Sequence, residues 1–221
     1  MRIKGKFILA ALCLVLFLTL IVLVRTVDVH PAGRAGGEIG LASVNGTVFE
    51  QFGENEALYK ITEVLGIAAI AVMALFAALG VVQIIKRRSL LKVDREIVAL
   101  GVLYAAVIAL YAFFEFVIVN YRPIIEEGAS APEASFPSSH TMLVFVVMGS
   151  AALVIGKYIK IEWLRTALRI ACVAVIAVTV AGRLISGVHW FTDIVGGIFI
   201  SSALLFTFSA ALDMIEEKEQ L

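Results

Sequence analysis

The sequence predicts an all-α integral membrane protein, a bundle of six transmembrane helices with both termini in the cytoplasm. Hydrophobic residues make up 61% of the 221-residue chain and the mean hydropathy is +1.00, whereas a soluble domain is about half apolar. Long apolar runs recur along the chain, and basic residues gather between alternate runs. The formal net charge is zero and no basic tract is present, so no nucleic-acid partner is expected. We expect residues 1–221 to form a single membrane domain.

The N-terminal quarter of the chain contains one apolar run followed by a polar stretch. Residues 7–25 are expected to be a retained transmembrane helix, because the run is long for a signal peptide and no small-residue cleavage site follows closely. Residues 26–59 are expected to be an extracytoplasmic loop that carries a short amphipathic helix near residues 44–52. The triplet Asn45-Gly46-Thr47 fits either a glycosylation site or a helix cap.

Residues 60–212 are expected to form a core of five further transmembrane helices. Each contains an apolar run that suits the interior of a bilayer. The expected helices are 61–85, 97–119, 140–156, 170–185 and 189–212.

The distribution of lysine and arginine orients this bundle. The N-terminus and the connections at 86–95 and 157–169 are basic, and basic connections face the cytoplasm. The connections at 26–59, 120–139 and 183–189 are then extracytoplasmic. The sequence therefore predicts a multi-pass protein of the cell membrane, with the polar residues near 122–140 and 183–193 on its extracytoplasmic side.

Three polar residues that can take part in a reaction interrupt the apolar sequence near the end of the chain: Arg183, His189 and Asp193. His189 and Asp193 are four residues apart, so on a helix they share a face. A carboxylate beside an imidazole can hold its tautomer and stabilise its charged form. The guanidinium of Arg183 suits phosphate or carboxylate oxygens. The structural alternative is that the three side chains line a water-filled cavity or only pair with each other.

Two further segments are expected on the same side of the membrane. Arg122 and Pro123 follow the third helix, and Pro137-Ser138-Ser139-His140 opens the fourth. A helix N-terminus offers free backbone N–H groups and suits an anion; simple N-capping by the serines is compatible with that role. Two arginines, two histidines and a helix N-terminus together favour a phosphate ligand.

The two histidines suggest a division of labour. His189, backed by Asp193, suits a nucleophile or base, and His140 suits a proton donor to the leaving group. Phosphoryl transfer needs mainly positioning and charge stabilisation, which arginines supply. A zinc site built on the two histidines and Asp193 is the competing interpretation, and the neighbouring arginines disfavour it because they would repel a divalent cation.

These segments resemble the three-part signature of the type-2 phosphatidic acid phosphatase family, whose soluble relatives include the vanadium haloperoxidases. That signature is a lysine, six residues and Arg-Pro; then Pro-Ser-Gly-His; then Ser-Arg, five residues, His, three residues and Asp. Arg122-Pro123 matches the end of the first part. Ser139 stands for glycine in the second part, and Gly182 for serine in the third. The resemblance covers about residues 115–193, and the six-helix layout extends it.

The resemblance implies a phosphatase that needs no metal and no cofactor. His189 would attack phosphorus and form a phosphohistidine, Asp193 would orient and charge-stabilise that imidazole, and His140 would protonate the leaving oxygen. The substrate would be a membrane lipid phosphate or diphosphate, of the undecaprenyl diphosphate, phosphatidylglycerol phosphate or phosphatidic acid type. Four residues would bind phosphate oxygens: Arg122, Arg183, Ser138 and Ser139.

One position departs from the signature in charge. Where the family has its first lysine, this chain has Glu115, which would repel a phosphate. Glu115 is open to three roles: pairing with Arg122, contact with a polar lipid headgroup, or contact with a neighbouring helix. The loss of the lysine also leaves open an alternative function, in which a weak or inactive homologue binds or transports a phosphorylated lipid.

Overall fold

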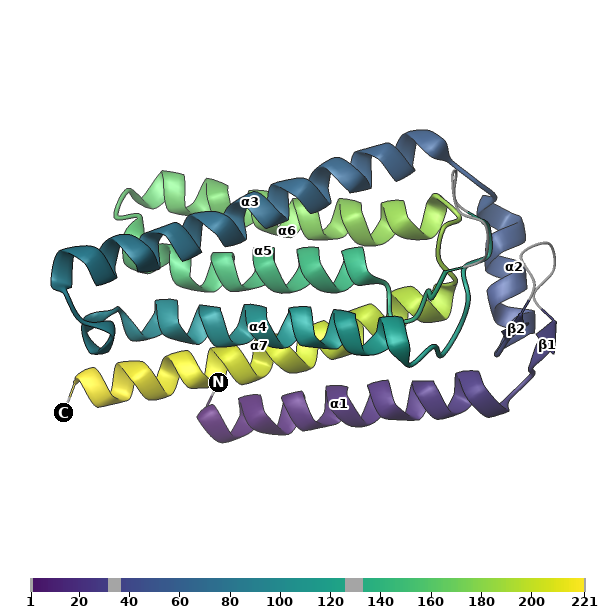
Figure 1. Cartoon of the computed structure of the whole chain (residues 1–221), viewed down its shortest axis with the longest axis horizontal. Helices are drawn as coiled ribbons and strands as arrows, with labels where there is room; N and C mark the ends of the chain where they lie inside the picture. The colour runs from purple at the N-terminus through teal and green to yellow at the C-terminus, as the bar shows by residue number, and fades with distance from the viewer. Residues whose placement is uncertain (1, 32–36, 126–132, 221) are drawn as a thin grey trace.

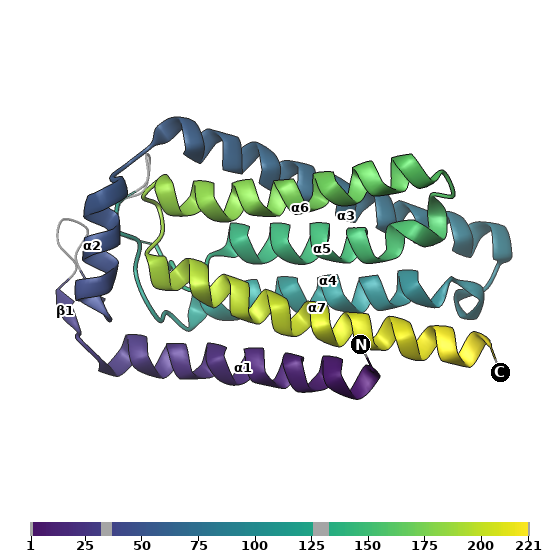
Figure 2. The ribbon, with the colours of Figure 1, turned by 180° about the vertical axis from the view of Figure 1, so that it is seen from behind.

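The computed structural model describes residues 2–31, 37–125 and 133–220. Within these residues, long helices run side by side as a bundle, and one short helix lies across one end (Figures 1 and 2). The described part of the chain contains six helices that are long and apolar enough to cross a membrane: α1 (Ile3–Thr26), α3 (Glu56–Arg87), α4 (Arg95–Phe116), α5 (Ser139–Tyr158), α6 (Glu162–Ile185) and α7 (Phe191–Glu219). The predicted all-helical architecture is confirmed, with six candidate membrane-spanning helices.

Two minor elements connect these helices. The strands β1 (His30–Pro31) and β2 (Glu38–Ile39) pair antiparallel next to α2 (Ala42–Phe52), and the 3-10 turn η1 (Leu90–Lys92) joins α3 to α4. The α3–α4 and α5–α6 connections lie at the end of the bundle opposite α2 (Figure 1). The basic connections are thus at one end and α2 at the other, while the assignment of the basic end to the cytoplasm stays a prediction.

The helix starts differ from the sequence-based prediction most clearly at α3 and α6, and α7 begins at Phe191, so that His189 lies before this helix and not on it. Helix α3 begins at Glu56 instead of residue 61, because Asn55 caps it by accepting a hydrogen bond from the Leu58 N–H at 3.0 Å. Helix α6 begins at Glu162 instead of residue 170. The expected basic loop at 157–169 is therefore mostly helix. Its basic residues are accommodated on α6, as shown by Arg169, whose side chain donates a hydrogen bond to the Ala152 carbonyl of α5 (3.1 Å).

The core of the bundle lies around α5. This helix packs against α3, α6 and α7, and its residues Val144, Val146 and Val147 are fully buried. The outer faces are apolar and exposed, as shown by Ile67, Leu75 and Val102, each with about two thirds of its surface exposed. Apolar side chains on the outside and inside of the same bundle are expected of a protein surrounded by lipid.

Helix α1 packs along α7 and closes one side of the bundle. Phe17 also joins α1 to other parts of the bundle: its ring centroid is 5.7 Å from that of Phe136, just before α5, in a stacked arrangement, and 5.8 Å from that of Phe114 on α4, edge-on. At the other end of α1, Lys6 Nζ is 2.6 Å from Asp213 Oδ2. Both chain ends accordingly point toward the end of the bundle opposite α2 (Figure 1).

Helix α2 lies across the end of the bundle where α7 begins (Figures 1 and 2). The fully buried Asn45 accepts a hydrogen bond from the Thr192 N–H (3.1 Å) and donates to Thr192 Oγ1 (3.0 Å). Asn45 lies inside α2 and not at its start, so the triplet does not cap its own helix, and the buried Asn45 amide is engaged with α7 and not exposed as a glycosylation acceptor would be. It satisfies one of the free N–H groups at the start of α7 from outside that helix.

Candidate active site

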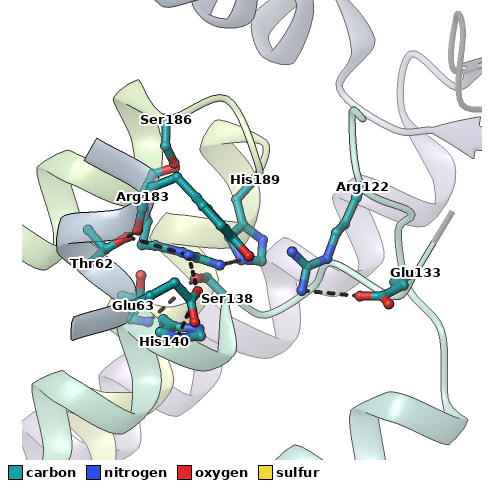
Figure 3. Close-up of polar contacts among 11 residues, drawn as sticks. Thr62, Glu63, Arg122, Glu133, Ser138, His140, Arg183, Ser186 and His189 are labelled. Atoms are coloured by element: carbon teal, nitrogen blue, oxygen red, sulfur yellow. Dashed lines mark hydrogen bonds and ion pairs between the residues drawn. The ribbon is translucent and has the colours of Figure 1, made fainter. Parts of the chain in front are cut away.

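The candidate site lies at the end of the bundle covered by α2. Helix α6 ends there, α5 and α7 begin there, and the segments on either side of residues 126–132 meet in an antiparallel bridge between Tyr121 and Ala134. The structure thus brings the polar segments near 122, 140 and 183–193 to one place (Figure 3). It places these predicted residues there: Arg122, Ser138, Ser139, His140, Arg183, His189 and Asp193.

His189 and Asp193 form the buried centre of the site. His189 Nδ1 is 3.6 Å from Asp193 Oδ2, and the two side chains are 1% and 0% exposed. Asp193 lies in the first turn of α7, where the same oxygen accepts the Trp190 N–H at 2.9 Å. A carboxylate is favoured in a first helical turn because of the helix dipole, so the local sequence holds the carboxylate in place for the imidazole.

The other nitrogen of His189 faces a cation. Arg183 Nη2 lies 3.4 Å from His189 Nε2, and because a guanidinium only donates, this contact fits a lone pair on Nε2 and a proton on Nδ1 toward Asp193. Burial lowers the pKa of His189 well below 6.5, and the positive charges of Arg183 and Arg122 lower it further. The imidazole is therefore neutral at neutral pH, with a lone pair on Nε2 that faces the Arg183 guanidinium.

Arg183 is fixed in a buried position between α3 and the α6–α7 turn. Its Nη1 donates to Glu63 Oε1 at 2.9 Å and to Thr62 Oγ1 at 3.4 Å, and its guanidinium lies over the Tyr59 ring, 5.3 Å from the centroid. The two arms of the fork thus face different groups, with Nη2 on His189 and Nη1 on α3. A guanidinium held at both arms has little conformational freedom left, so substrate binding would cost little further side-chain entropy.

Arg122 approaches His189 from the other side, so that His189 lies between the two arginines in Figure 3. Its Nη2 is 3.5 Å from Glu133 Oε2, and its backbone N–H donates to the Glu133 carbonyl at 3.0 Å. The antiparallel bridge therefore holds Arg122 and Glu133 together. Two guanidiniums on either side of one imidazole form a strongly positive environment for an anion.

The start of α5 supplies His140 and the two serines. Ser138 is fully buried and accepts a hydrogen bond from the Thr141 N–H (3.4 Å), which makes it the N-cap of α5. Ser139 is the first residue of the helix and is half-buried. His140 Nε2 lies 3.1 Å from Glu63 Oε1, and its ring packs against Gly66, where an added Cβ would lie 2.8 Å from His140 Cδ2.

Glu63 is a site residue that sequence reasoning missed. It lies in the second turn of α3, and a single oxygen, Oε1, contacts both His140 Nε2 (3.1 Å) and Arg183 Nη1 (2.9 Å) (Figure 3). The only signal in the sequence is an acidic residue at the start of an apolar run, and none of the three motifs includes it. Its role depends on α3 packing against α5 and α6.

The two remaining departures from the family signature have different surroundings. Gly182 faces Thr62, whose Cγ2 would lie 2.6 Å from an added Cβ, so a serine at this position would collide with α3. Glu115 is exposed on α4 and borders a small pocket together with Tyr111, Ser139 and His189. The structure thus places the carboxylate next to the site, on the wall formed by α4.

A larger pocket leads from His140 along the outside of the bundle. It has a volume of about 420 Å³ and lies between α3, α4 and α5. Glu63, Tyr111, Ser139 and His140 line its polar part, and most of the remaining lining is apolar: Gly66, Ile67, Ile70, Met73, Val107, Ile108, Met142 and Leu143. A molecule with a polar head and an apolar tail fits this distribution.

No cluster of three or more His, Cys, Asp or Glu side chains within residues 2–31, 37–125 and 133–220 is arranged to hold a metal ion. The charged side chains in contact with the His189 nitrogens are instead the Asp193 carboxylate and the Arg183 guanidinium. This donor set suits an anion and does not suit a divalent cation.

Comparison with known proteins agrees with this geometry. Residues 98–216, more than half of the chain, match the PAP2 superfamily. The crystal structure of a transmembrane PAP2-type phosphatidylglycerolphosphate phosphatase from Bacillus subtilis is similar, with a TM-score of 0.63 over 96% of each chain and 16% sequence identity. Among curated protein sequences no significant match is found. The chain therefore belongs to the PAP2 superfamily, as a multi-pass membrane protein with the fold of a PAP2-type phosphatase.

Proposed function

We propose that this protein is a phosphatase that hydrolyses a lipid phosphate or diphosphate through a phosphohistidine on His189. The observation that carries the proposal is the position of His189 Nε2. This nitrogen faces Arg183 at 3.4 Å, while Nδ1 faces the buried Asp193. A neutral imidazole with its lone pair directed into a positive site is the arrangement required for attack on phosphorus.

The first step transfers the phosphoryl group to the protein. His189 Nε2 attacks phosphorus, the P–O bond to the lipid breaks, and its electron pair stays on the leaving oxygen, which takes a proton from His140. Asp193 stabilises the positive charge that forms on His189. The bound oxygens of the phosphoryl group face Arg122, Arg183 and the N-terminus of α5 with Ser138 and Ser139.

The second step returns His189 to its starting form. His140, now neutral, removes a proton from a water molecule as the water oxygen attacks the phosphohistidine. The P–N bond breaks, its electron pair returns to Nε2, and phosphate leaves. Each residue thus ends as it began, and no metal ion or cofactor takes part in this scheme.

Two features support a lipid as the substrate. The site lies at one end of a membrane-spanning bundle, and the 420 Å³ pocket beside His140 is polar at His140 and largely apolar beyond it. A headgroup could reach the arginines while its tail remains against α3 and α4. The positive-inside pattern of the connections supports the extracytoplasmic face of the cell membrane as the place of reaction.

A second candidate function is binding or transport of a phosphorylated lipid without turnover. Glu115 favours it, because a carboxylate stands where the family has a lysine. The buried His189–Asp193 pair argues against it, since a binding protein has no need for a nucleophile with a carboxylate partner.

The two functions differ in phosphate release, which tests them directly. We expect purified protein in detergent to release phosphate from phosphatidic acid, phosphatidylglycerol phosphate or undecaprenyl diphosphate, and to do so equally with EDTA present. The scheme uses only side chains, so chelation should leave the rate unchanged. Folded protein that binds these lipids in a flotation assay but releases no phosphate from any of them would favour the binding or transport function.

The proposed proton donor makes a separate prediction. His140→Ala should slow hydrolysis of a lipid alcohol phosphate by about 10²- to 10⁴-fold, the usual contribution of a general acid. A substrate with an acidic leaving group, such as p-nitrophenyl phosphate, needs no proton and should lose far less. An equal loss on both substrates, measured as kcat/KM, would remove His140 from this role.

A further inference from the structure

Glu63 contacts two side chains that the proposed reaction assigns to the substrate, His140 and Arg183. Its Oε1 atom accepts from both His140 Nε2 (3.1 Å) and Arg183 Nη1 (2.9 Å). In the proposed first step the leaving oxygen must likewise approach His140. The carboxylate of Glu63 therefore stands on the leaving-group side of the site, whereas His189 stands at the other arm of the Arg183 fork, at Nη2.

The lipid pocket lies on the same side as Glu63. Glu63 and His140 line it together, and its apolar part continues along α3 and α4 from Gly66 and Ile67. When the tail of a lipid lies in this pocket, the atoms next to its leaving oxygen lie beside Glu63. The side chain is 37% exposed, so it can rotate aside without leaving the neighbourhood of the leaving group.

We propose that Glu63 makes the enzyme selective for the leaving group, favouring phosphate esters of a neutral lipid alcohol over lipid diphosphates. When a diphosphate reacts, the leaving group is a phosphorylated lipid, which already carries negative charge and gains more as the P–O bond breaks. A neighbouring carboxylate repels that charge. An alcohol leaves uncharged once His140 has given it a proton. This inference rests on the proposed function and specifies its substrate class.

Two other observations point the same way. Glu63 engages one arm of Arg183, so that arm serves a second phosphate group only if the carboxylate is displaced. Glu115 on α4 adds a carboxylate at the edge of the site, at the position where the family has a lysine. Both carboxylates lower the net positive charge of the site. A diphosphate depends on that charge more than a monophosphate does, because its two phosphate groups must be bound together.

The experiment compares two substrates with identical tails, farnesyl phosphate and farnesyl diphosphate. The measured quantity is the ratio of kcat/KM for the monophosphate to kcat/KM for the diphosphate, in detergent. We expect the ratio to be about tenfold or more in the unchanged protein, and to fall by about tenfold in Glu63→Gln, which removes one charge at contact distance from the site. A merely structural role of Glu63 would lower both rates together and leave the ratio unchanged.

Glu56→Gln is the matched control. Glu56 lies on the same helix and is exposed, with its carboxylate 2.5 Å from Lys60 Nζ, so its removal should not change the ratio. Glu63→Asp retains the charge and should keep the preference for the monophosphate. If Glu63→Gln does not fold, the ratio in the unchanged protein still tests the selectivity.

The outcomes separate this inference from the proposed function. Equal or faster hydrolysis of the diphosphate by the unchanged protein would overturn the selectivity, and so would an unchanged ratio in folded Glu63→Gln; in both cases the phosphatase function would stand. Absence of phosphate release from both substrates by folded protein would overturn the phosphatase function and the selectivity with it.

Discussion

Replacement of His189 by alanine should lower phosphate release by about 10⁴-fold or more, the scale seen when an enzyme loses its nucleophile. His189 Nε2 is the atom that the structure places beside Arg183, and no remaining side chain at that position could accept the phosphoryl group. The measurement is steady-state release from a lipid phosphate in detergent. The loss should be in kcat, because Arg122, Arg183 and the start of α5 would still bind the phosphate.

The fold of this variant has to be checked, because His189 is buried. His189→Gln fills much of the same volume and serves as the control for packing; it should be as inactive as His189→Ala, with the elution volume and circular dichroism of the unchanged protein. A folded variant that keeps a tenth or more of the activity would contradict the assignment of His189 as the nucleophile.

Replacement of Asp193 by asparagine should have the second largest effect, a loss on the order of 10²- to 10⁴-fold in kcat. The amide keeps the size of the carboxylate, and its oxygen can still accept from the Trp190 N–H, which Asp193 does at 2.9 Å. It loses the negative charge that stabilises a positively charged His189, and it can present an N–H to Nδ1, which would favour the wrong tautomer.

Asp213→Asn is the matched control for this prediction. Asp213 is on the same helix, where its partner is Lys6 at the far end of the bundle. This variant should keep the kcat of the unchanged protein. A folded Asp193→Asn variant with a kcat within about threefold of the unchanged protein would contradict this assignment, because removal of a catalytic carboxylate lowers kcat far more. The carboxylate would then have only a structural role at the start of α7.

The sequence alone predicted the six helices and the residues gathered at the site, because both depend on local patterns. Apolar runs of membrane-spanning length indicate helices whatever their neighbours are. A family motif names His189, Asp193, the arginines and His140. These features require no knowledge of which helices touch. The four-residue spacing was wrong about how His189 and Asp193 meet, because His189 lies in the turn before α7 and only Asp193 is on that helix.

The role of Glu63 could not be predicted, because it arises from contacts between α3, α5 and α6 that are far apart in the sequence. Its partners His140 and Arg183 lie 77 and 120 residues further along the chain. The same holds for Asn45, whose triplet suggested two local roles although its side chain binds Thr192 on α7. The start of α6 could not be predicted for another reason. Its first turns carry basic residues, and the low hydropathy of such residues is typical of a loop.

The most direct test of the account is to trap the phosphorylated protein. Protein with EDTA is mixed with ³²P-labelled farnesyl phosphate and quenched in alkali within milliseconds, since phosphohistidine survives alkali and is lost in acid. We predict label on the peptide that contains His189, formed no slower than phosphate is released and absent from His189→Ala. Phosphate release at the full rate without labelled protein, or label on another residue, would contradict the mechanism.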